Sequence, residues 1–496
     1  MKPVVVVGAG VGGLVAALEL AVRGHAVTVL ERATTPGGKL RSVAVGGRAL
    51  DAGPTVFTQK PWFDDIFARA GARLDEHLRL SPLTVLARHA WSDGSRFDLP
   101  TEAEAAVDAV GRFAGSAEAQ RYRRFRADAA AIYQVLEQPF MCASRPSLPG
   151  LLARVGPRRL PALAAIRPFT SLWHALGDYF HDPRLRQLFA RYATYVGASP
   201  WRAPATLMLI AHVESLGVWR LEGGMARLAE ALAGLAAARG VAFRYGSEVR
   251  TIERVGGRVR GVRLADGERL AASAVIANVD IGALRDGSLG DDLRAAAPSR
   301  AARSSSALTW NVVARTAGFP LHHHNVFFGD DYAEEFTAVF ERQALPRDPT
   351  VYVCAQDARL TADDAPDERG LLCLINAPAN GDRVAYDAAR LAQAETAMRE
   401  RLARVGLTLS FEPTRCVVTS PTDFAARFPG AGGAIYGPVG HGWRASFARG
   451  GARSRVPGLY LAGGSVHPGP GVPMAALSGR LAAAALHADL TRGARE

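Results

Sequence analysis

A run of four valines that leads into a glycine-rich turn restricts most strongly what this chain can fold into. Residues 4–30 read VVVVGAGVGGLVAALELAVRGHAVTVL: an apolar run, glycines spaced G-x-G-x-x-G, a segment of helical length and a second apolar run. A buried strand, a helix and another buried strand form a βαβ unit, whose two strands lie parallel in one sheet. The first residues therefore predict an α/β fold.

The spacing of these glycines also predicts what the turn holds. Gly8 would make the tight turn, Gly10 would let the backbone approach a diphosphate, and Gly13 would let the helix pack closely on the strand. The helix N-terminus would then face the phosphates with its partial positive charge. Glu31 ends the second apolar run, where a carboxylate can accept a hydrogen bond from a ribose hydroxyl. Together they favour a dinucleotide site over a purely structural turn.

The order of patterns along the chain indicates interleaved domains. Helical segments dominate from about residue 98, a glycine entry and helix begin at 222, and strand-like runs mix with one helix between about 305 and 415. We expect residues 1–97, 222–285 and 416–496 to form one Rossmann-like domain. Residues 98–221 would be a helical region that faces the substrate and the membrane, and residues 286–415 would supply the sheet of a substrate domain.

The net charge limits the kinds of ligand that the protein can bind, and the cysteine spacing limits the disulfides and metal sites that it can form. The formal net charge is +12, which favours anionic ligands or lipid headgroups, but the arginines are dispersed and we expect no nucleic acid partner. The cysteines lie far apart without a C-x-x-C pair, which argues against a disulfide framework, a zinc site or an iron–sulfur cluster. They are Cys142, Cys354, Cys373 and Cys416.

Two further stretches identify the cofactor by resemblance. ERATTPGGKLRS (31–42) and DAGPTVF (51–57) resemble the extended flavin-binding motif of the amine-oxidase-like flavoproteins, in which Gly37 and Gly38 permit backbone approach beside the cofactor. That family usually has arginine where this chain has Lys39. The resemblance implies FAD as the cofactor.

The end of the chain sharpens the resemblance. LYLAGGSVHPGPGVPMAALSG (459–479) is similar to the C-terminal motif of bacterial carotenoid desaturases, and residues 182–225 and 322–336 support the same family. ARHAWSDGSRFDL (87–99) and EGGM (222–225) look most like 1-hydroxycarotenoid 3,4-desaturases, also called methoxyneurosporene dehydrogenases, of photosynthetic bacteria. The implied function is FAD-dependent desaturation of an acyclic carotenoid. A phytoene-type desaturase, or a flavoprotein that binds or isomerises carotenoids without oxidising them, is the alternative.

The family's cofactor contacts carry over to matching positions of this chain. The last strand and glycine pair would place backbone amides beside the flavin, and the following Pro- and Gly-rich loop would form a wall beside its ring system. The expected cofactor-binding residues are Gly8, Gly10, Gly12, Gly13, Glu31, Gly38, Lys39, Val249, Gly463, Gly464, Val472 and Pro473.

Carotenoid desaturation removes two hydrogens from adjacent carbons, and a hydride transfer to flavin N5 followed by proton loss is the expected route. Glu222 and His467 are the candidate catalytic residues. Glu222 could instead cap the helix that begins near Met225, and His467 could instead be structural. The His322–His324 run does not favour a metal, because consecutive residues cannot easily all face one ion.

The resemblance places the protein at a lipid surface. No apolar stretch is long enough to span a bilayer, so we expect a cytoplasmic protein bound peripherally to the inner or photosynthetic membrane. Residues 145–180 combine Arg, Leu, Phe and Trp with few acids, which suits an interfacial patch, although an internal helical hairpin is the alternative. The arginines to test are Arg154, Arg158, Arg159 and Arg167. Oxygen or a quinone would be the terminal electron acceptor.

Overall fold

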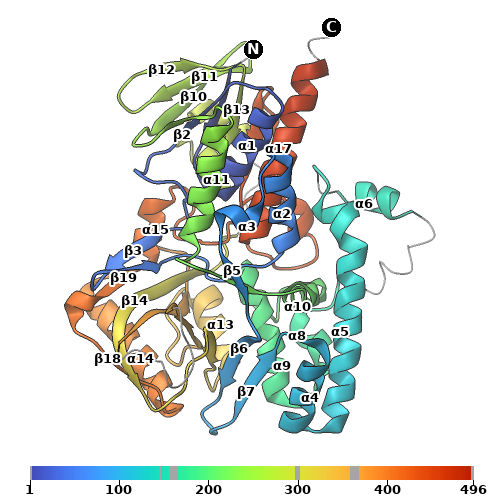
Figure 1. Cartoon of the computed structure of the whole chain (residues 1–496), viewed down its shortest axis with the longest axis vertical. Helices are drawn as coiled ribbons and strands as arrows, with labels where there is room; N and C mark the ends of the chain where they lie inside the picture. Colours follow the sequence, from blue (N-terminus) through green and yellow to red (C-terminus); the bar gives the residue numbers. More distant parts are fainter. Residues whose placement is uncertain (1–2, 146, 157–165, 297–301, 358–367, 493–496) are drawn as a thin grey trace.

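The computed structural model describes residues 3–145, 147–156, 166–296, 302–357 and 368–492. Two sheets organise these residues: a five-stranded parallel sheet and an eight-stranded, mostly antiparallel sheet. Figure 1 shows the parallel sheet with its helices in the upper half of the molecule and the larger sheet in the lower half, beside a layer of helices.

The parallel sheet draws its strands from the beginning, the middle and the end of the chain. Its order is β20 (Leu459–Leu461), β13 (Ala274–Ala277), β1 (Val4–Val7), β2 (Val27–Leu30) and β9 (Ala242–Arg244). Val4 pairs with Ala274 on one side and with Val27 on the other, in parallel register. The carboxyl ends of these strands therefore meet at one edge, where ligands bind in open α/β sheets.

Alternation along β1 explains why both faces of this sheet are covered. Val4 and Val6 pack in one core with the helices, whereas Val5 and Val7 pack in another core with a small three-stranded sheet. The helices are α1 (Val11–Val22), α2 (Lys60–Arg69), α11 (Ala226–Ala238) and α17 (Val472–Arg492). The small sheet is β10 (Val249–Val255), β11 (Arg258–Leu264) and β12 (Arg269–Ala271).

The larger sheet is built around β14 (Ser306–Ala317), its longest strand. The other strands are β6 (Val85–Ala90), β7 (Arg96–Pro100), β15 (His324–Phe327), β16 (Val351–Ala355), β17 (Arg369–Ala377), β18 (Thr408–Ser410) and β19 (Cys416–Thr419). The core on one face also includes residues of α14 (Ala388–Arg404). β6 pairs with β15 and β19 pairs with β14, so both β6–β7 and β19 cross the domain boundaries expected at residues 97 and 416.

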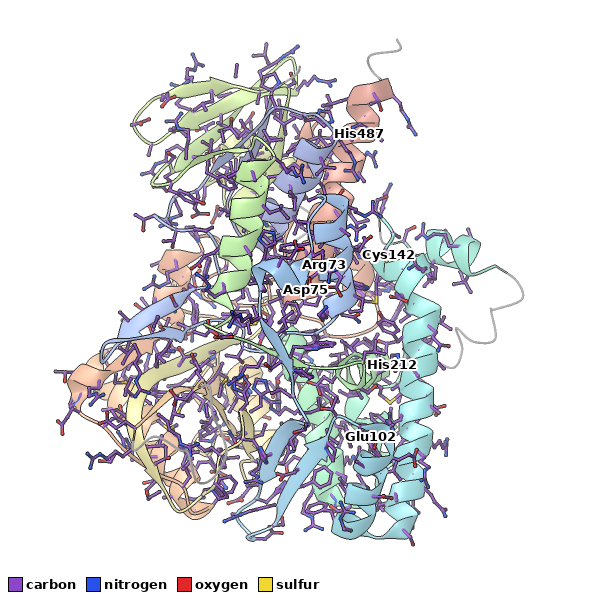
Figure 2. All side chains as sticks on the ribbon, in the orientation of Figure 1. Arg73, Asp75, Glu102, Cys142, His212 and His487 are labelled. Carbon is purple, nitrogen blue, oxygen red and sulfur yellow. The ribbon has the colours of Figure 1, made fainter. Side chains whose placement is uncertain are left out.

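The helical layer packs against the opposite side of this sheet through a core rich in aromatic residues. It comprises α4 (Ala103–Ala114), α5 (Ser116–Leu136), a π-helical turn η1 (Glu137–Met141), α6 (Leu148–Val155), α8 (Leu172–Gly177), α9 (Pro183–Ala190), η3 (Arg191–Val196), η4 (Ala205–Met208) and α10 (Leu209–Ser215). A hollow of about 330 Å³ lies between α5 and α10, and His212, labelled in Figure 2, lines it. Among the described helices, none combines the length and the apolar character that crossing a bilayer requires.

Shorter elements connect these layers. They are β3 (Ser42–Val45), β4 (Arg48–Asp51), α3 (Leu74–His77), β5 (Leu80–Pro82), β8 (Trp219–Leu221), α12 (Ile281–Arg285), η5 (Asp291–Ala296), α13 (Tyr332–Thr337), η6 (Ala338–Arg342), η8 (Pro413–Arg415), α15 (Pro421–Arg427) and α16 (Ala445–Ala448). All four cysteines are free, including Cys142, which follows η1 near the upper end of α5 (Figure 2).

Candidate active site

The turn between β1 and α1 leaves no room for side chains. Gly8 has a φ of +99°, and a Cβ placed on it would lie 2.5 Å from the carbonyl oxygen of Asn278. A Cβ on Gly13 would lie 2.1 Å from the carbonyl oxygen of Gly8. Both distances are shorter than any normal contact, so glycine at these positions lets α1 begin directly against the strands.

A second helix begins beside the same turn. Val472 and Pro473 open α17, which packs along α1 so closely that a Cβ on Gly479 would lie 2.2 Å from the carbonyl oxygen of Gly12. Helix N-termini carry unpaired amides and a partial positive charge. Two such ends at the carboxyl edge of the parallel sheet suit a diphosphate.

Asn278, just after β13, lies against the glycines of this edge, and nothing in the sequence singled it out. Its Nδ2 donates to the carbonyl oxygen of Ala462 at 3.1 Å, while its Oδ1 is buried without a hydrogen-bond partner. A Cβ on Gly10 would lie 2.8 Å from that Oδ1, and one on Gly463 would lie 2.6 Å from Nδ2. The glycines and the unsatisfied acceptor together form a cradle lined by backbone, which a hydroxyl-bearing ligand can enter.

Glu31 lies at the end of β2, where the sequence placed it. Its two carboxylate oxygens accept hydrogen bonds from the backbone amides of Ala9 at 2.7 Å and Ala33 at 2.8 Å. Each oxygen keeps a second lone pair, so the carboxylate can still accept from a ribose hydroxyl. Val249, at the start of β10, packs in the same apolar cluster as Leu30 and so lies near this end of β2.

The segment after β2 returns to the glycine turn. Gly10 and Gly37 form a parallel bridge, and a Cβ on Gly38 would lie 3.3 Å from the Cα of Gly10. Lys39 donates to the carbonyl oxygen of Ile435 at 2.7 Å. Burial lowers the pKa of Lys39, and the nearby Asp280 carboxylate partly offsets that shift.

The C-terminal glycine pair is held by side chains that the sequence did not single out. Ser478 accepts from the backbone amide of Gly463 at 3.1 Å, and the Arg449 guanidinium donates to the carbonyl oxygen of Gly464 at 3.1 Å. Arg449 is buried, and desolvation lowers its pKa to about 10. The structure therefore places two buried cations, Lys39 and Arg449, within the field of Asp280.

His467 follows this pair and is 2% exposed. Its Nε2 lies 2.9 Å from the carbonyl oxygen of Phe140, and because a carbonyl can only accept, Nε2 carries the proton. Nδ1 is then an unprotonated nitrogen, and it is buried without a partner. Desolvation lowers the pKa of His467 to about 4, so the ring is neutral at pH 7.

Glu222 is not part of this buried group: its side chain is 61% exposed, and its carboxylate lies 3.8 Å from the Arg79 guanidinium. Nor is it the cap of α11. The carboxylate of Asp51 accepts from the backbone amides of Met225 at 2.7 Å and Ala226 at 3.4 Å, and burial raises the pKa of Asp51. The capping alternative suggested for Glu222 is therefore replaced by Asp51.

Asp51 also ties the cofactor-binding half to the larger sheet. Its carbonyl oxygen accepts from Nδ2 of Asn311 at 2.7 Å and from Nε2 of Gln356 at 2.9 Å. Four residues further on, the Thr55 hydroxyl lies 2.6 Å from that of Tyr352. The DAGPT segment thus lies between the cofactor cradle and the interior of the substrate domain.

Polar side chains in the interior between the helical layer and the larger sheet form hydrogen bonds with one another. Glu214 accepts from the hydroxyls of Tyr192 and Tyr195, each at 2.7 Å, and burial raises the pKa of Glu214. The ring of Tyr192 also lies 6.0 Å from that of Phe189 and 5.5 Å from that of Tyr195.

The side chains of the three consecutive histidines contact different groups. His322 turns to Asp98 at 3.3 Å, His323 Nδ1 donates to the carbonyl oxygen of Ala355 at 2.7 Å, and His324 Nδ1 lies 2.7 Å from the Tyr352 hydroxyl. His323, His324 and Cys354 nevertheless bring possible ligand atoms within 4.8 Å of one another, closer than the sequence suggested. Burial raises the pKa of Cys354 far above its usual range, so the thiol is protonated as long as no metal ion binds it.

This fold and this site define a flavin-dependent oxidoreductase of the amine-oxidase type. The family model of the flavin containing amine oxidoreductases matches residues 11–487. Solved structures with the same fold include an oxidoreductase from Methanosarcina mazei, with a TM-score of 0.59 and 17% identity over 96% of this chain and 99% of that chain. A putrescine oxidase bound to putrescine gives 0.59 and 15% over 98% of this chain and 99% of that one.

Relatives that match nearly the whole chain define the class of flavoprotein more narrowly. The hydroxyneurosporene desaturase of Rubrivivax gelatinosus is 53% identical over 99% of this chain and 94% of its own length. That of Cereibacter sphaeroides is 47% identical over 99% of both chains, and a 1-hydroxycarotenoid 3,4-desaturase of Flavobacterium is 30% identical over 97% and 98%. The chain therefore belongs to the flavin-containing amine oxidoreductases, within their carotenoid desaturase branch.

Proposed function

We propose that the protein is an FAD-dependent desaturase that introduces the 3,4 double bond into acyclic 1-hydroxycarotenoids. The observation that carries this proposal is the 53% identity to a hydroxyneurosporene desaturase, extending over 99% of the chain. A packed apolar, aromatic core lies between the helical layer and the larger sheet, which fits a protein that acts on a hydrocarbon.

The site supports FAD rather than a mononucleotide. Glu31 would accept from an adenosine ribose, and the N-termini of α1 and α17 would face a diphosphate, and FMN contains neither group. Of the predicted contacts, Gly8, Gly10, Gly38 and Gly464 keep accessible surface, whereas Gly12 and Gly13 are buried packing positions. When bound, the flavin would supply the acceptor for the hydride.

His467 is the stronger of the two candidate catalytic residues. Its Nδ1 is an unprotonated, unpartnered nitrogen held in place by the Nε2 hydrogen bond to Phe140. A base with a pKa of about 4 is weak, but the proton next to a polyene cation is very acidic, so a weak base suffices to hold it. Glu222, at the surface, would need a large movement to take that role.

Purified protein in liposomes with FAD should convert 1-hydroxyneurosporene to a product whose absorption is shifted to longer wavelength, since one more double bond extends the conjugated chain. Phytoene and neurosporene, supplied separately, should react much more slowly. Products are followed by chromatography with absorption spectra, with oxygen or a quinone as the only acceptor in parallel reactions.

Turnover of phytoene in preference to the hydroxylated substrate would move the protein to the phytoene-type desaturases. Isomerised carotenoid without consumption of an acceptor would instead identify a non-oxidative flavoprotein. Either result would refute the proposed reaction.

The substrate resides in lipid, and we propose that α6 contacts the membrane surface. Leu148 and Leu152 are each 42% exposed and lie four residues apart on one face of α6, which projects from the side of the molecule in Figure 1. Phe169 is 80% exposed. Of the arginines named for this segment, Arg167 is paired with Asp178, and Arg158 and Arg159 lie outside the described residues.

Replacing both Leu148 and Leu152 by glutamate should weaken binding to anionic liposomes about tenfold or more, because two apolar side chains lose burial and two negative charges meet an anionic surface. Sedimentation with vesicles measures this. The matched control is Val255→Glu, since Val255 is 66% exposed at the end of β10, in the upper part of the molecule (Figure 1). Equal losses in both variants would refute contact through α6.

A further inference from the structure

Arg191 is a half-buried cation that has no acidic partner among the described residues. It opens η3, directly after α9, and its guanidinium lies over the rings of Tyr195 at 5.5 Å and Tyr352 at 5.3 Å. The one hydrogen bond that its guanidinium makes to a described residue is from Nη1 to the Tyr195 hydroxyl, at 3.5 Å. No carboxylate of the described chain forms an ion pair with it. Burial lowers the pKa of Arg191, but the surrounding tyrosines more than offset this effect, so the guanidinium stays charged without an ion pair.

The Arg191 guanidinium is surrounded by protein but is not sealed off from accessible surface. Arg191 is strongly desolvated by the surrounding protein, yet its side chain keeps accessible surface. Tyr195 and Tyr352 show the same combination. Only one of the five N–H donors of the guanidinium has a hydrogen-bond partner among the described residues, so the others can donate to a ligand.

The nearby carboxylates are held by other donors. Glu214 is occupied by two tyrosine hydroxyls, and Glu335 accepts from Nδ2 of Asn376 at 2.7 Å. The charge of Arg191 lowers the pKa of both carboxyls, partly offsetting the larger effect of burial. Arg191 is thus close enough to lower the pKa of both carboxyls, but it forms an ion pair with neither of them.

Two other polar atoms in this interior also lack partners. His324 Nε2 and the Tyr332 hydroxyl have no hydrogen bond to any described residue, although His324 is 3% and Tyr332 7% exposed. Arg191 influences the pKa of both groups, so they lie around it. His324 is linked through Tyr352 to Thr55, in the segment beside the cofactor cradle.

We propose that Arg191 donates a hydrogen bond to the oxygen at the end of the carotenoid chain and so selects 1-hydroxylated substrates. The inference rests on the proposed function. In that reaction the hydroxyl on C1 lies within about 4 Å of C3, given bond lengths near 1.5 Å, so its partner must lie close to the cofactor. Arg191 lies on the side of this interior that contacts the DAGPT segment, because its guanidinium stacks on Tyr352, whose hydroxyl bonds Thr55.

An arginine suits this task for chemical reasons. The guanidinium is always charged and only donates, and the oxygen of a tertiary alcohol can always accept. A hydrocarbon end group offers no acceptor and leaves the cation desolvated and unpaired. A polar site of this kind rejects the analogue lacking the oxygen much more strongly than an apolar pocket rejects an extra group.

The test compares kcat/KM for 1-hydroxyneurosporene with that for neurosporene, which lacks the oxygen, in the full-length flavin-loaded enzyme. Arg191→Met should reduce the ratio about 10- to 100-fold, the loss expected for a hydrogen bond to a charged group. Arg191→Lys, which keeps a charge and donors, should lose less. The ratio is measured within one preparation, so partial unfolding of a variant does not affect it.

Arg186→Met is the matched control. Arg186 lies on α9 and also stacks on an aromatic ring, 4.1 Å from the centroid of Trp173, but its donors are taken by the carbonyl oxygen of Trp173. Its ratio should equal that of the wild type. An unchanged ratio in Arg191→Met, or an equal fall in both variants, would overturn the proposal while leaving the desaturase intact. A wild-type enzyme that prefers neurosporene would instead refute the proposed function itself.

Discussion

Replacing Gly8 by alanine should yield protein that no longer retains flavin. The residue has a φ of +99°, which costs an alanine about 1–3 kcal/mol. The added Cβ would also lie 2.5 Å from the carbonyl oxygen of Asn278, a backbone atom that cannot rotate away. Overlap of this kind adds about 1–3 kcal/mol. Since each 1.4 kcal/mol is about tenfold in affinity, flavin binding should fall at least tenfold.

Substitutions at two other glycines distinguish the effect of backbone strain from the effect of atomic overlap. Gly24 has a φ of +80° but no atom within 4 Å of its added Cβ, so Gly24→Ala introduces the strain without the overlap. It should lower stability by about 1 kcal/mol and keep the flavin. Gly234, inside α11, has ordinary backbone and open space, so Gly234→Ala should be neutral or stabilising by up to about 1 kcal/mol. Flavin absorbance per protein measures all three; full flavin content in Gly8→Ala would contradict the role of this turn.

The elements that the sequence predicted well are those whose chemistry is local. The βαβ unit, Glu31 at the end of β2 and the glycine pair after β20 all follow from patterns within about thirty residues. The structure places Glu31 and the glycines of both ends at one edge of the parallel sheet. Their contacts with the cofactor stay a prediction.

The residues that the sequence missed depend on distant parts of the chain. Asn278 matters because Gly10 and Gly463 lie against it, and Arg449 because its guanidinium reaches Gly464. Glu222 seemed favourable because glycines follow it, but its backbone amide bonds the carbonyl oxygen of Arg79 and its side chain turns outward. The pairing of β6 with β15, a strand more than 200 residues later, has the same origin. A local pattern contains no information about such pairings.

Asp51→Ala should destabilise the protein by about 2–4 kcal/mol and lower its desaturation rate. The carboxylate caps α11 through Met225 and Ala226, which lie 174 and 175 positions away, so its loss leaves two amides without partners in the interior. Gly224 packs directly on this carboxylate, with its added Cβ only 2.7 Å from Oδ1. The substitution therefore loosens the junction between the cofactor-binding half and the larger sheet.

Asp51→Asn tests the electrostatic part of this junction. Burial raises the pKa of Asp51, so the folded protein holds the proton more tightly than the unfolded chain does. The stability that this group contributes is then greatest at acidic pH and falls as pH rises from 3.8 through the raised value. Asparagine does not titrate. The free energy of unfolding of the wild type should therefore fall relative to that of Asp51→Asn as pH rises through that window. Urea unfolding at a series of pH values measures it.

Asp64→Ala is the control for both variants, because Asp64 is an exposed carboxylate paired with Lys60 on the surface of α2. Its effect should stay within about 0.5 kcal/mol and should not depend on Asp51. If Asp51→Ala were as mild as this control, the amides of α11 would have another acceptor and the cap would not be what joins the two halves. A large loss in Asp51→Ala with unchanged flavin content would instead place the effect on the helix and the sheet, and not on the cofactor cradle.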